Sequence, residues 1–134
     1  MQQKLIWAVL YYLRFWARLA LAWHKPTVIG IAGSVGKSSA KRAVYAVLKD
    51  YFPTAYLEGN SETGIPLGIL GLEPSDFSWR DWLRMTVLAP FGLNHLKKTK
   101  YLVIEMGTDG PEPPANMEYL LTIVKPDYAI FLNA

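Results

Sequence analysis

The feature that most constrains the fold is a β-branched run that leads through a glycine turn into a helix. Residues 27–32 (Thr-Val-Ile-Gly-Ile-Ala) predict a buried strand, and residues 33–36 (Gly-Ser-Val-Gly) predict a turn. Residues 37–50 have the spacing of a helix with an apolar face made of Ala40, Ala43, Val44, Val47 and Leu48. A strand, a glycine turn and a helix in this order are the setting of a phosphate-binding P-loop.

This turn has the residues that bind a nucleotide phosphate. Glycines let backbone N–H groups converge on phosphate oxygens, and the helix N-terminus adds partial positive charge. We predict that Lys37 reaches the β- and γ-phosphates of ATP and that Ser38 ligates Mg²⁺. The sequence matches the short pattern G-x-x-G-K-[ST], because the longer pattern requires glycine where this chain has Ile31. The predicted cofactor-binding residues of the loop are Gly33, Ser34, Val35, Gly36, Lys37, Ser38 and Ser39.

A second strand supplies a candidate metal ligand. Residues 101–106 (Tyr-Leu-Val-Ile-Glu-Met) have the apolar centre of a buried parallel strand, and Glu105 stands near its C-terminal end. Open α/β sheets bind their ligands at that edge. Glu105 is therefore a candidate Mg²⁺ ligand, directly or through water. The alternative is a carboxylate that only ends the strand.

The order of elements predicts the fold class. Strands are predicted at residues 54–57 and 127–133 as well as in the two runs above, and helices at 3–23, 37–50, 65–72, 79–89 and 117–124. Alternation of this kind predicts an α/β, three-layer α/β/α domain with a mainly parallel sheet. We expect residues 127–133 to be buried. We also expect the sheet to be incomplete, because the last strand ends at the chain terminus.

Residues 1–25 predict an amphipathic helix whose role the sequence leaves open. Lys4, Arg14 and Arg18 fall on one side of it, and its uncharged stretch is too short for a typical membrane span. The helix packs on its own domain or a partner domain, or it lies on a membrane surface with Trp7, Trp16 and Trp23 at headgroup depth. A true membrane span or an uncleaved signal is the remaining alternative.

Charge and composition limit the classes of partner and of site that we expect for this chain. Residues 1–50 hold eight Lys or Arg and a single acid, Asp50, which suits an anionic partner. No nucleic-acid-binding motif is present, so we expect no nucleic acid partner. The chain has no cysteine, which excludes disulfides and thiolate metal sites.

Four blocks in order resemble the central ATP-binding domain of the Mur ligases, and within them the branch that adds D-alanyl-D-alanine. They are residues 28–39 (the P-loop), 59–67 (Gly-Asn-Ser-Glu-Thr-Gly-Ile-Pro-Leu), 101–107 and 125–133. The resemblance covers roughly residues 10–134 and makes residues 26–134 the N-terminal portion of that domain. It implies that Lys37 and Glu105 are catalytic, that Ser38 and Glu105 hold magnesium, and that Asn60 lies near nucleotide and metal. The family often has two adjacent asparagines where this chain has Asn60 and Ser61.

The resemblance also implies an activity. Mur ligases are cytoplasmic enzymes of peptidoglycan synthesis that phosphorylate a carboxylate with ATP and let an amine attack the acyl phosphate. The partners implied are ATP and, in a complete protein, a UDP-linked muramyl peptide and a dipeptide. Because the family's substrate domains have no counterpart in these 134 residues, we expect a fragment that does not ligate alone. Two alternatives are a non-catalytic nucleotide-binding or membrane-associated interaction module and a folylpolyglutamate synthase-like ligase fragment.

Overall fold

The computed structural model describes residues 2–108 and 110–133. The elements are α1 (Gln2–His24), β1 (Thr27–Gly33), α2 (Lys37–Leu48), β2 (Thr54–Tyr56), α3 (Gly64–Ile69), α4 (Trp79–Leu88), the 3₁₀ helix η1 (Ala89–Asn94), β3 (Tyr101–Glu105), α5 (Met117–Ile123) and β4 (Tyr128–Leu132). The four strands form one sheet in the order β2-β3-β1-β4, and every pairing is parallel. The predicted α/β class and parallel sheet are confirmed.

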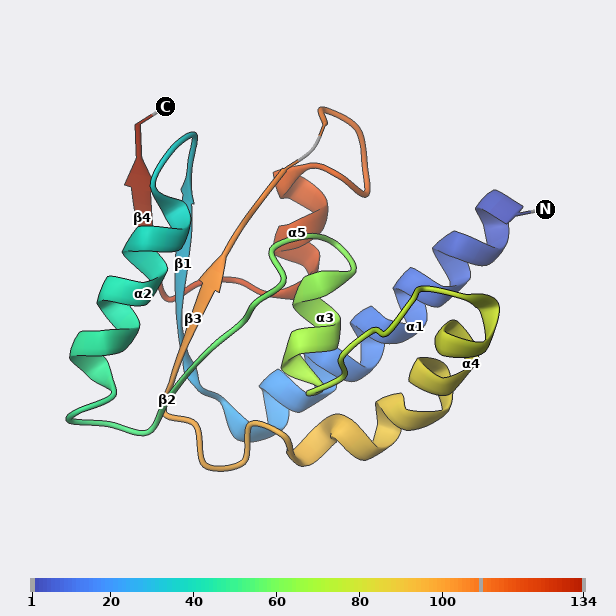
Figure 1. The fold of residues 1–134 in the computed structure, drawn as a ribbon, viewed down its shortest axis with the longest axis horizontal. Coiled ribbons are helices and arrows are strands. Elements are labelled where there is room, and N and C mark those ends of the chain that lie inside the picture. Colours follow the sequence, from blue (N-terminus) through green and yellow to red (C-terminus); the bar gives the residue numbers. More distant parts are fainter. Residues whose placement is uncertain (1, 109, 134) are drawn as a thin grey trace.

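Helices cover both faces of the sheet. Helix α2 lies on one side, whereas α3 and α5 lie on the other with α1 and α4 beyond them (Figure 1). Successive side chains of β3 point to opposite faces of the sheet, so they contact different helical layers. Leu102 and Ile104 belong to the core shared with α1, α3 and α5, and Glu105 faces α2. The arrangement is consistent with a three-layer α/β/α domain.

The main core lies between the sheet and the helices on the α3 side. Helix α1 contributes Leu13, Ala17 and Ala20, all fully buried, and the two alanines allow close approach of the neighbouring helices. Helix α3 is buried along most of its length, including Ile65 and Leu67.

The predicted apolar face of α2 is only partly right. Ala40, Val44 and Leu48 are half-buried, but Ala43 and Val47 are exposed to solvent. The fully buried position on this helix is Lys41, between Ala40 and Arg42. The helix is therefore turned so that a charged residue, rather than Val47, faces the sheet.

The expectation that residues 127–133 are buried is wrong. Strand β4 forms as predicted, but its side chains are largely exposed, and Phe131 is 80% accessible. Among the described residues, β4 lies at the edge of the sheet with β1 as its strand neighbour. An apolar run indicates that a strand can be buried, but it does not say whether a neighbouring layer covers it.

Helix α1 packs on the domain instead of standing free. The Tyr12 hydroxyl donates to the Thr86 carbonyl oxygen at 2.8 Å, and Arg14 donates to the Thr122 hydroxyl at 2.9 Å. Trp7 and Trp16 pack against the core. Within the described residues, α1 is also the one helix that is long and apolar enough to cross a membrane by length and composition. Of its most apolar stretch of residues, 22% are buried.

Candidate nucleotide and metal site

The predicted P-loop lies between β1 and α2, and its two glycines have backbone conformations that other residues rarely adopt. Gly33 has φ +141° and Gly36 has φ +87°. A Cβ at Gly33 would lie 1.8 Å from the Leu132 carbonyl oxygen, so β4 packs directly against the start of the loop. Helix α2 begins at Lys37 immediately after the left-handed Gly36. Its N-terminus is therefore presented at the carboxyl edge of the sheet, where an anion is stabilised.

The loop residues are open to solvent, and two of their polar groups have intramolecular partners. Ser34, Val35, Gly36 and Ser39 are exposed. The Lys37 ammonium donates to the Gly33 carbonyl oxygen at 2.7 Å, which holds it across the mouth of its own loop. The Ser34 N–H donates to the carbonyl oxygens of Leu132 and Asn133 at 3.2 and 3.1 Å. A phosphate that binds in the loop would compete for these donors.

Glu105 brings two other predicted residues together. It pairs with Ile31 in the sheet register, and only 6% of it is exposed. The Ser38 hydroxyl donates to its Oε2 at 3.0 Å, and the Asn60 amide donates to its Oε1 at 3.4 Å. The backbone carbonyl oxygen of Asn60 accepts from the Gly107 N–H at 2.8 Å. This bond holds the 59–64 loop against the end of β3.

Lys41 is a site residue that the sequence reasoning missed. Its ammonium lies 3.7 Å from Glu105 Oε2 and donates to the Leu57 carbonyl oxygen at 3.1 Å. It also lies over the Tyr56 ring, 5.4 Å from the centroid. A hydrogen bond and charge from Glu58 raise the pKa of Tyr56. The position of Lys41 in the sequence could have identified it. Lys41 lies one helical turn after Lys37, on the side of the helix that must face the sheet.

The donor set suits magnesium better than a metal that needs several protein ligands. Among the described residues, no group of three or more His, Asp or Glu side chains could hold a metal ion. The site instead pairs one carboxylate, Glu105, with one hydroxyl, Ser38. Mg²⁺ prefers oxygen ligands and commonly takes one or two from protein, with waters and nucleotide phosphates completing its shell. Ser38 Oγ keeps lone pairs for a metal while its O–H group donates to Glu105. The residues present therefore fit the predicted metal.

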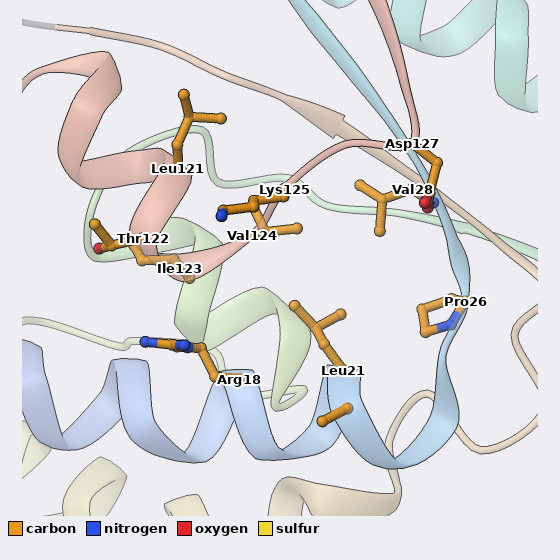
Figure 2. A pocket seen from close by; sticks show the side chains of 11 residues that line it. Arg18, Leu21, Pro26, Val28, Leu121, Thr122, Ile123, Val124, Lys125 and Asp127 are labelled. Carbon is orange, nitrogen blue, oxygen red and sulfur yellow. The ribbon is translucent and has the colours of Figure 1, made fainter.

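A separate hollow contains none of the predicted site residues. It measures about 350 Å³ and lies between the end of α1, the start of β1 and α5. Figure 2 shows Arg18 and Leu21 facing Thr122 and Lys125 across it, with Asp127 near Val28 at its far end. The Asp127 carboxylate accepts from the Val28 N–H at 2.8 Å. The polar groups that line it are exposed or already paired.

Comparison with known proteins identifies a distant relative. No family model matches the sequence. The UDP-N-acetylmuramoyl-tripeptide–D-alanyl-D-alanine ligase of Buchnera aphidicola subsp. Baizongia pistaciae (strain Bp) is 29% identical over 109 residues. The matched part is 80% of this chain and 18% of the relative's length. This similarity supports a distant relationship to the Mur ligases.

Proposed function

We propose that this chain is the nucleotide-binding part of an ATP-dependent, amide-bond-forming ligase of the Mur type, acting in peptidoglycan precursor synthesis. The observation that carries the proposal is the meeting of P-loop and carboxylate: Ser38 Oγ lies 3.0 Å from Glu105 Oε2 at the carboxyl edge of a parallel sheet. The named relative supports the same reaction class, because it is a ligase of a muramoyl tripeptide and D-alanyl-D-alanine.

Each site residue has a role in this proposal. The backbone N–H groups of residues 33–39 cradle the phosphates, and Lys37 leaves the Gly33 carbonyl oxygen to neutralise charge on the β- and γ-phosphates. Ser38 and Glu105 would hold Mg²⁺, and Asn60 keeps Glu105 oriented through its amide. When bound, ATP supplies the phosphoryl group and Mg²⁺ neutralises charge that develops during its transfer.

The proposed reaction has two steps. A substrate carboxylate oxygen attacks the γ-phosphorus, the bond from that phosphorus to the β–γ bridging oxygen breaks, and ADP leaves. The amine of the second substrate then attacks the acyl carbon, loses a proton and expels phosphate. In a complete protein the two substrates are a UDP-linked muramyl peptide and a dipeptide, and the enzyme works in the cytoplasm.

The chain alone is expected to bind nucleotide without ligating. It covers 18% of the relative's length, so the groups that bind the two substrates are assigned to other parts of a complete protein. In this proposal residues 1–25 are the helix that precedes the ATP-binding domain, and residues 26–134 are the front of that domain.

Magnesium-dependent ATP binding, measured by titration calorimetry, tests the proposal. Wild type is expected to bind ATP with Mg²⁺, and Lys37→Ala is expected to lose that binding because the loop lysine is gone. Lys49→Ala is the matched control, since Lys49 is an exposed lysine at the other end of α2. A folded wild-type chain that does not bind ATP, or a Lys37→Ala variant that binds as well as wild type, would contradict the proposal.

A non-catalytic nucleotide-binding module is the second candidate. It is favoured by the P-loop itself, in which both Lys37 and the Ser34 N–H already have intramolecular acceptors. ATP binding with little dependence on Glu105 would favour this module, because a ligase needs the carboxylate for its metal. Strong loss of Mg²⁺-dependent binding in Glu105→Gln would favour the ligase.

A further inference from the structure

Charge is segregated between two parts of this molecule. We define the basic layer as residues 2–25 and 77–98, which include α1, α4 and η1. It holds eight of the 14 Lys and Arg residues but one of the 11 acids, Asp81. The eight are Lys4, Arg14, Arg18, Lys25, Arg80, Arg84, Lys97 and Lys98. Figure 1 shows α1 and α4 lying together on the side of the molecule away from α2.

The single acid in the basic layer contributes little to its surface. Asp81 is buried, and its carboxylate is 2.6 Å from the Arg84 guanidinium. The same carboxylate accepts backbone N–H groups from Ser75 and Phe77 at 2.8 and 3.1 Å. Arg84 balances Asp81, and Arg14 and Arg18 lie toward α5. The remaining basic side chains, all exposed, are Lys4, Lys25, Arg80, Lys97 and Lys98, and they give the layer its positive surface.

The same layer exposes an apolar stripe. Trp79, Leu83 and Val87 are spaced four residues apart along α4 and point to solvent, with Trp79 71% accessible. Phe91 continues the spacing into η1 and is 81% accessible. We call Trp79, Leu83, Val87 and Phe91 the α4 stripe. Helices normally turn such a stripe toward the core, so its exposure indicates a surface that contacts something else.

A groove joins the α4 stripe to α1. It has a volume of about 770 Å³, and its lining is mostly apolar. Its lining includes Leu5, Ile6 and Val9 of α1 and Trp79 and Leu83 of α4. Glu62 is the acidic side chain among the residues that line the groove. The apolar surface therefore extends over both helices.

We propose that α1, α4 and η1 form a docking surface for an anionic membrane. The α4 stripe would enter the boundary between headgroups and acyl chains, and the basic side chains would contact anionic headgroups. Exposed Trp, Leu and Val beside arginines are the composition of helices that lie in a membrane interface. Arg80 stays beside the stripe, 5.4 Å from the Trp79 ring centroid, where it can reach a headgroup.

This surface fits lipid better than nucleic acid, and α1 fits a helix that lies on the membrane better than one that spans it. Base and phosphate recognition uses hydrogen-bonding and stacking side chains, whereas Leu83 and Val87 offer only aliphatic surface. Spanning would separate α1 from its partners on three elements. These are Thr86 of α4, Leu93 of η1 and Thr122 of α5.

Vesicle co-sedimentation with a matched pair of valine variants tests the proposal. Val87 lies in the α4 stripe and is 58% accessible, whereas Val47 lies on α2, outside the basic layer, and is 64% accessible. The probes are phosphatidylcholine vesicles and vesicles that contain about one-third phosphatidylglycerol. Wild type is expected to bind the anionic vesicles and to release them as salt rises. Val87→Glu is expected to weaken this binding by about tenfold or more, because a carboxylate would enter both apolar and anionic surroundings.

The outcomes are distinct. Binding that Val87→Glu weakens and Val47→Glu leaves unchanged supports the docking surface, provided that circular dichroism shows both variants folded. No binding of wild type to anionic vesicles at low salt, equal binding to both kinds of vesicle, or equal loss in the two variants overturns it. Dimerisation that Val87→Glu abolishes, without vesicle binding, assigns the surface to a second copy and also overturns it. Lys37→Ala is expected to bind vesicles like wild type, which separates this result from the nucleotide test.

Discussion

Replacing Lys41 with methionine tests whether the buried ion pair organises the site. Lys41 is 5% exposed and Glu105 6%, so water screens their 3.7 Å contact only weakly. Methionine keeps the length of the side chain but removes the charge, which leaves Ser38 and Asn60 as the partners of Glu105 among the residues that the structure describes. Removing one partner of a buried pair costs about 3–5 kcal/mol. We expect the low end, about 3 kcal/mol, because the two hydrogen bonds remain.

The assay is urea unfolding followed by the fluorescence of the five tryptophans. A loss of about 3 kcal/mol corresponds to a melting temperature lower by roughly 10 °C for a chain of this size. The double variant Lys41→Met with Glu105→Gln should recover much of the loss, because no unpaired charge is then buried. Lys49→Met is the control and should stay within about 0.5 kcal/mol of wild type, because Lys49 is exposed. A coupling energy below about 0.5 kcal/mol would refute the reasoning.

Magnesium gives the same variants a second readout. In Lys41→Met, the divalent cation would supply the positive charge that Glu105 has lost, so added Mg²⁺ should raise the free energy of unfolding more than in wild type. In Glu105→Gln this extra stabilisation should disappear. Equal effects of Mg²⁺ on Lys41→Met and Glu105→Gln would show that Glu105 does not bind the metal.

Two further predictions concern the backbone and the pH dependence. Gly33→Ala should cost about 2–4 kcal/mol in urea unfolding, because its Cβ would meet the Leu132 carbonyl oxygen at 1.8 Å, whereas Gly110→Ala, with its nearest neighbour at 4.0 Å, should change little. The Arg84 guanidinium and backbone N–H groups hold the pKa of Asp81 well below its usual 3.8. Asp81 therefore stabilises the fold above that usual pKa and loses this contribution as pH falls toward its folded-state pKa. Asp81→Asn should be less stable than wild type at pH 7, and the difference should shrink in acid unfolding experiments; a constant difference would contradict this origin.

Part of the candidate site could be predicted from local sequence patterns. The spacing of Gly33, Gly36, Lys37 and Ser38 predicted a loop between a strand and a helix, and the structure has that loop. The position of Glu105 near the end of its strand made it a candidate magnesium ligand, and in the structure Ser38 donates to it. The two side chains meet because parallel strands bring their carboxyl ends to one edge of the sheet. Whether these residues bind ATP and Mg²⁺ stays a prediction.

The burial of Lys41 was not predicted by local sequence patterns. Apolar spacing selected Ala43 and Val47 for the buried face of α2, and both are exposed. The helix is rotated because Glu105 occupies the facing position on β3 and a buried carboxylate needs a cation nearby. A pattern within one helix contains no information about the charge on a strand more than 60 residues away in sequence.

By itself the sequence determined the order of strands and helices, the parallel sheet and the glycine loop between β1 and α2, because these follow from short-range spacing and backbone preference. Only the tertiary structure decided which apolar faces are covered. It buried one side of α1 against α3, left β4 at an exposed edge and turned the α4 stripe toward solvent. The physical reason is that burial depends on what lies beside an element, and neighbours in space are fixed by the packing of the whole chain.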